Sequence, residues 1–106
     1  SDVYKRQVAS KELRTLVDNI KKQNKAVIVA LLSKIGNKVQ IAVGVSDCLI
    51  GKVSAIELVK ILSSKTGGNG GGGRPDFAQG GGTAPDQADN ALIDLKVYLK
   101  GTLTHS

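Results

Sequence analysis

The stretch AVIVALLSKIGNKVQIAVGV, residues 26–45, decides the fold because it encodes two strands and the turn between them. Residues 26–33 form a short, branched, apolar run that is typical of a buried strand. Residues 39–45 alternate valine and isoleucine with smaller or polar residues, which predicts a strand with one face in the core. Gly36 and Asn37 supply turn chemistry between the two runs. The stretch therefore predicts a β-hairpin.

A helix is predicted before the hairpin and another after it. Over residues 9–24 the apolar residues recur at helical spacing. They are Leu13, Leu16, Val17 and Ile20. After the hairpin, Ser54 and Glu57 form a capping box, which predicts a helix that starts near Ala55 and ends by Thr66.

A last helix is predicted to begin around Pro85, because proline suits the first position of a helix. Its apolar face consists of Ala88, Ala91, Leu92, Leu95 and Leu99. The order of elements predicts one α/β domain, with helices packed on a small mixed or antiparallel β-sheet. Two strands make a thin sheet, so a third strand is expected; the glycine-rich segment is a candidate, but the sequence does not locate the strand.

Composition excludes several classes of site. The chain has 106 residues, one cysteine (Cys48) and one histidine (His105), so neither a disulfide framework nor a Cys- or His-based metal site is expected. No nucleophile, acid and base form a catalytic constellation, and we expect no catalytic residue. The longest apolar run, residues 26–32, is too short for a membrane span, and no secretory signal is visible. These features predict a soluble, cytoplasmic protein that does not contact a membrane.

The distribution of charge indicates where an anionic partner would bind. The net charge is +6. Residues 1–74 hold 13 of the 15 Lys and Arg against five acids, a balance of +8, whereas residues 75–106 hold two against four, a balance of −2. A phosphate-rich partner should therefore meet the first three-quarters of the chain. On the first helix the candidate phosphate contacts are Lys11, Arg14, Lys21 and Lys22, although a solvated helix face is the favoured explanation of these residues taken alone.

The segment TGGNGGGGRPDFAQGGG, residues 66–82, is the most informative for function and holds nine of the 13 glycines. A flexible linker is the simplest interpretation, but the segment lies between two periodic helices of one small domain. Glycines let a backbone approach a ligand and present its N–H groups to an anion. Phe77 is interpreted as a core anchor in preference to a base-stacking residue. The candidate binding residues are Lys65, Asn69, Gly70, Gly71, Gly72, Gly73, Arg74 and Gln79.

Residues 67–82 resemble a signature of the C-terminal domain of alanyl-tRNA synthetase, the C-Ala or DHH-associated domain. The resemblance covers about residues 11–103. Asn69 stands where the family often has lysine, Phe77 stands where it has methionine, and one extra residue lies among the glycines.

Residues 1–7 match nothing in that family pattern. We interpret them as a non-native scar and leave them out of the fold prediction. The nucleic-acid-binding domain is then expected to comprise residues 8–106.

The resemblance implies a role without catalysis. A C-Ala domain contacts the elbow of tRNA(Ala), helps its synthetase couple aminoacylation to editing, works beside the other domains of that enzyme, and in some members forms homo-oligomers. It holds no cofactor, whereas the parent ligase is expected to use ATP, Mg and Zn.

Two alternatives to this function stay open. One is the nucleic-acid clamp of a DHH phosphoesterase, although the glycine segment lacks the histidine such clamps usually carry. The other is an oligomerisation domain built on the apolar helix around residues 56–62.

Overall fold

The computed structural model describes residues 2–5, 12–23, 26–68 and 70–104 of the chain. The regular elements are, in chain order, β1 (Asp2–Lys5), α1 (Leu13–Gln23), β2 (Ile28–Ile35), β3 (Lys38–Val45), the 3-10 turn η2 (Asp47–Leu49), α2 (Ala55–Lys65), β4 (Gly70–Arg74), β5 (Phe77–Gly82), the 3-10 turn η3 (Pro85–Gln87) and α3 (Ala88–Thr104).

The strands form one five-stranded sheet in the order β1-β2-β3-β5-β4. β1 runs parallel to β2, and the other three pairs are antiparallel. The sheet is therefore mixed, and helices pack on it, which confirms the predicted fold class. The β2–β3 turn lies at the predicted place, and Gly36 there has a φ of 56°.

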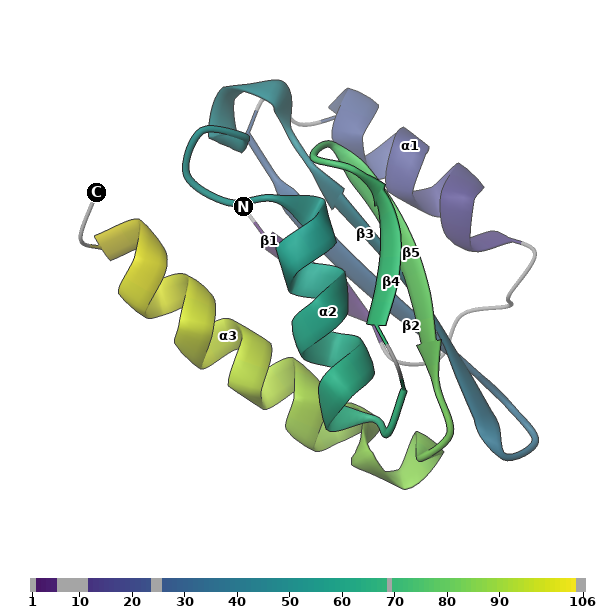
Figure 1. Cartoon of the computed structure of the whole chain (residues 1–106). Helices are drawn as coiled ribbons and strands as arrows, with labels where there is room; N and C mark the ends of the chain where they lie inside the picture. Colours follow the sequence, from purple (N-terminus) through teal and green to yellow (C-terminus); the bar gives the residue numbers. More distant parts are fainter. Residues whose placement is uncertain (1, 6–11, 24–25, 69, 105–106) are drawn as a thin grey trace.

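Helices cover the sheet on both faces (Figure 1). α2 and α3 pack on one face, over inward residues that include Ile28, Ile41, Val43 and Ala78. α1 packs on the other face, mainly on β2 and β3. The strands alternate between two apolar clusters because successive side chains of a strand point to opposite faces.

The predicted helices are present, with shifted ends. The Ser54 hydroxyl accepts a hydrogen bond from the Ile56 N–H at 3.2 Å, so Ser54 is the N-cap of α2, as predicted. In α3, all five residues of the predicted apolar face are buried. The apolar residues of α2 are also used in the core, where Leu58, Val59 and Leu62 are fully buried. Core packing therefore accounts for the helix that the oligomerisation alternative invoked.

In its described residues, the glycine segment is mostly a β-hairpin and is not a flexible linker. Residues 70–82 form the β4–β5 hairpin, which supplies the strands that the predicted sheet lacked. Glycine is required at position 71 of β4 because both the β5 backbone and α2 approach it closely. A Cβ on Gly71 would collide with the Gln79 carbonyl oxygen and with Val59 Cγ1 of α2.

The N-terminal residues differ from the prediction in one respect. Asp2–Lys5 form β1, at the edge of the sheet, with Val3 opposite Val29. Leaving residues 1–7 out of the fold was therefore wrong for this strand, which has too few residues to show a period of its own. The origin of residues 1–7 stays a prediction.

Candidate nucleic-acid interface

The face of the sheet that carries α1 is only partly covered. α1 packs mainly on β2 and β3, whereas β5 and β4 continue the sheet beyond it. Antiparallel pairing places Arg74 opposite Phe77 and Gly72 opposite Gln79. Phe77 belongs to the apolar cluster beneath α1, so all four residues face the α1 side. The polar and glycine residues of the hairpin therefore border the helix on that side.

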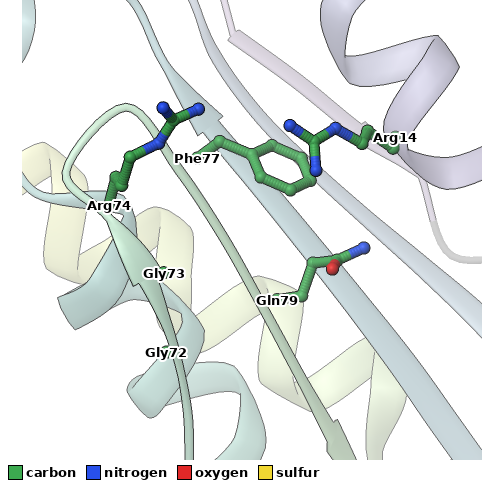
Figure 2. A pocket seen from close by; sticks show the side chains of 6 residues that line it. All are labelled: Arg14, Gly72, Gly73, Arg74, Phe77 and Gln79. Carbon is green, nitrogen blue, oxygen red and sulfur yellow. The ribbon is translucent and has the colours of Figure 1, made fainter.

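A hollow of about 280 Å³ lies at this border. We call it the arginine hollow, and its lining residues are Arg14, Gly72, Gly73, Arg74, Phe77 and Gln79 (Figure 2). Five of these residues were candidates from the sequence. In Figure 2 the guanidinium groups of Arg14 and Arg74 lie on opposite sides of Phe77, while the Gln79 side chain extends below the ring. Segments far apart in the sequence thus place two cations and an amide around one hollow.

Phe77 supports Arg14. The Arg14 guanidinium carbon lies over the Phe77 ring, 4.8 Å from its centroid, which is cation–π geometry. Phe77 is only 8% exposed and packs with Leu13 and Val17 of α1. The interpretation of Phe77 as a core anchor is confirmed. Phe77 also positions an arginine, and no sequence pattern indicates this contact because it joins residues remote in the chain.

A second hollow of about 200 Å³ shares Gln79 with the first and is also lined by Leu13, Gln40, Ile41 and Gly80. Gln40 is exposed, and β3 places it opposite Gly81. It was not among the predicted binding residues. The alternation of β3 could have identified it, because Gln40 lies on the polar face of that pattern.

Asp76 joins two basic residues at the β4–β5 turn. Its Oδ1 lies 3.5 Å from Arg74 Nε, and its Oδ2 lies 3.9 Å from Lys21 Nζ. Lys21 Nζ also donates a hydrogen bond to the Asp76 carbonyl oxygen at 3.0 Å. Arg74 keeps 68% of its side-chain surface exposed, whereas Lys21 keeps 19%. Lys21 therefore ties α1 to the turn, and Arg74 presents its guanidinium to solvent.

The other predicted residues are not brought to the hollow. Lys65 pairs with Asp94 of α3, with 3.5 Å between Nζ and Oδ2, and Lys22 is exposed on α1. Gly70 and Gly71 lie in β4, where Gly71 contacts α2. Lys11 and Asn69 lie outside the described residues.

Within the described residues, His, Cys, Asp and Glu form no group that could hold a metal ion. In the same part of the chain, each helix is too short or too polar to cross a membrane.

Comparison with known proteins identifies the relatives of this chain. The family model described as "DHHA1 domain" matches residues 3–101. The alanine–tRNA ligase of Hyphomonas neptunium is 46% identical over 94 residues, and that of Parvibaculum lavamentivorans is 47% identical over 90. These matches cover 89% and 84% of this chain, but only 11% and 10% of the ligases. The chain thus spans about a tenth of the length of these relatives.

A solved structure has the same fold. It is the C-Ala domain from Aquifex aeolicus alanyl-tRNA synthetase, with a TM-score of 0.78 and 39% sequence identity. The match covers 89% of this chain and 83% of that domain.

Proposed function

Because the chain belongs to the DHHA1 domain family, we propose that it is the C-terminal tRNA-binding module of an alanine–tRNA ligase. The arginine hollow is the observation that carries the proposal. Arg14 and Arg74 offer planar, permanently charged groups suited to phosphate and base recognition. Gly72 leaves the floor of the hollow open, since nothing lies within 4 Å of a Cβ built there. A nucleic-acid strand can thus approach the sheet closely at this place.

The proposed target is the elbow of tRNA(Ala), where the D and T loops meet. Folded RNA is recognised mainly by shape, by backbone contacts and by unstacked bases. The two hollows share Gln79, and each is lined by one residue of α1 together with residues of the sheet. A hollowed surface of this kind, with exposed arginine and glutamine side chains, suits an irregular RNA surface better than a regular duplex.

In the parent enzyme, we propose that this module helps one tRNA reach both the aminoacylation site and the editing site, in a cytoplasmic setting. The reactions belong to the other domains. ATP, Mg and Zn are assigned to those domains as well.

The experiment is a binding titration of the 106-residue chain with a tRNA(Ala) transcript over a series of salt concentrations. Three or four phosphate contacts should give a slope of log K against log salt of about −3. A minihelix made of the acceptor stem and T arm, which lacks the D loop, should bind more weakly. Equal binding of the two RNAs would remove the elbow from the proposal, and a salt-independent affinity would contradict the phosphate contacts.

The phosphoesterase alternative loses support. The relatives described above are alanine–tRNA ligases, and the solved structure is a domain of the same synthetase. In addition, the β4–β5 hairpin contains no histidine.

A further inference from the structure

We propose that Arg14 is a stacking platform that receives one unstacked nucleobase of the bound RNA in the arginine hollow. This inference rests on the proposed function, because it names the part of the RNA that enters the site. The nucleobase lies against the Arg14 guanidinium, faces Gln79 with its polar edge, and leaves its phosphate to Arg74.

The first argument is that the Phe77 ring is already in use. One side of it packs into the cluster beneath α1, and the Arg14 guanidinium lies over it at 4.8 Å. Phe77 is only 8% exposed as a residue, so little of its ring is open for a base to stack on. The guanidinium, in contrast, is a planar group that can stack on both of its faces. A base that enters the hollow would therefore stack on the Arg14 guanidinium and not on the Phe77 ring.

The second argument concerns the pairing of the two arginines. Arg74 shares the Asp76 carboxylate with Lys21 at the turn. Arg14 contacts Phe77 and, among the described residues, pairs with no carboxylate. The ring thus orients the guanidinium, while no carboxylate of the described residues forms an ion pair with it. A guanidinium that is oriented in this way can stack against a flat, electron-rich ligand.

The third argument is the shape and chemistry of the hollow. Gly72 provides a floor without a side chain, and Gln79, directly opposite it on β5, is exposed. An amide can both donate and accept hydrogen bonds, which suits the edge of a base and is not needed for a phosphate. A volume of about 280 Å³ accommodates a planar heterocycle as well as a phosphate. The lining therefore favours a nucleobase over a phosphate alone.

The test separates base from phosphate with small probes. The four nucleoside monophosphates and ribose 5-phosphate are titrated into the isotope-labelled chain by NMR. We expect at least one monophosphate to bind about fivefold more tightly than ribose 5-phosphate, which lacks a base to stack. The ring current of that base should also shift the Arg14 Nε–H resonance upfield. Equal affinities for all five probes would overturn the inference and leave a phosphate site.

Variants then connect the hollow to RNA. Arg14→Lys keeps the charge and removes the planar group, so it should weaken binding of the tRNA(Ala) transcript about tenfold at constant salt. Lys60→Ala, at an exposed position of α2 on the opposite face, is the control and should bind as the unchanged chain does. The thermal midpoint of each variant verifies that the fold is retained.

The outcomes distinguish this inference from the proposed function. If the unchanged chain binds the transcript and Arg14→Lys binds it equally well, the stacking role is wrong while the tRNA-binding role stands. If the unchanged chain binds the transcript no better than the minihelix, the elbow proposal fails, and the monophosphate titration decides separately whether the hollow accepts a base.

Discussion

Basic residues that are neighbours in this domain differ in their exposure and in their contacts with the rest of the fold. Lys21 and Lys22 are adjacent in α1, yet Lys21 is largely buried against the β4–β5 turn and Lys22 is exposed. Arg74 has features of both lysines, because it contacts Asp76 at the turn and still exposes most of its side chain to solvent. An exposed ion pair contributes about 0–1 kcal/mol to stability. We therefore expect Arg74 to matter more for RNA binding than for the stability of the fold.

Arg74→Ala tests this balance. We expect weaker tRNA binding and a salt slope reduced in magnitude by about 1, since one phosphate contact is lost. The thermal midpoint should change little because the ion pair is exposed. Parallel titration and thermal unfolding measure the two effects. A fall in stability as large as the fall in affinity would assign Arg74 to the turn, where Asp76 holds it.

At the scale of elements, the β4–β5 hairpin has two faces with different requirements. Gly71 faces α2, where a Cβ has no space, and Gly72 faces the open hollow, where it has ample space. Packing explains the first glycine and leaves the second unexplained. We propose that Gly72 gives a ligand access to the sheet, since glycine permits a close approach.

Valine substitution of the two glycines separates packing from binding. Gly71→Val should destabilise the fold by about 1–3 kcal/mol, because overpacking displaces α2. Gly72→Val should keep or raise the thermal midpoint, since valine favours strands and Gly72 has no positive φ. It should also weaken tRNA binding about tenfold, or ~1.4 kcal/mol, by filling the floor of the hollow. Unchanged RNA affinity in Gly72→Val would argue against binding in the hollow.

At the scale of the whole molecule, the glycine-rich hairpin is built into the sheet. β5 lies between β3 and β4, so its backbone is paired on both sides. The hairpin is also tied to the loops around it, because the Val45 N–H donates to the Asp76 carbonyl and the Ala55 N–H donates to the Pro75 carbonyl. Self-association of the domain stays a prediction, and sedimentation velocity across protein concentrations tests it.

Amide hydrogen exchange measures directly how firmly the β4–β5 hairpin is held in the sheet. The amides of residues 77–82 should exchange slowly, with backbone order parameters of about 0.85, because both edges of β5 are paired. The same values are expected with and without RNA, since the site is already formed. Fast exchange or low order parameters in both states would show that the glycine segment behaves as a linker and would remove the basis for the hollow.

The sequence by itself determined the elements whose residues have a period: the β2–β3 hairpin, the three helices and the apolar face of α3. It also placed the excess of positive charge and the candidates Arg14, Arg74 and Gln79. The helices and strands could be predicted because their apolar residues recur at a fixed spacing within a short segment of the chain.

Tertiary structure alone decided the conformation of the glycine segment and the contacts within the candidate site. A run of glycines has no alternating pattern, so only pairing with β3 and the close approach of α2 make it a hairpin. The contact of Arg14 with Phe77, and the separation of Lys21 from Lys22, depend on where α1 meets the sheet. Such contacts join residues remote in the chain, and local propensity carries no information about them.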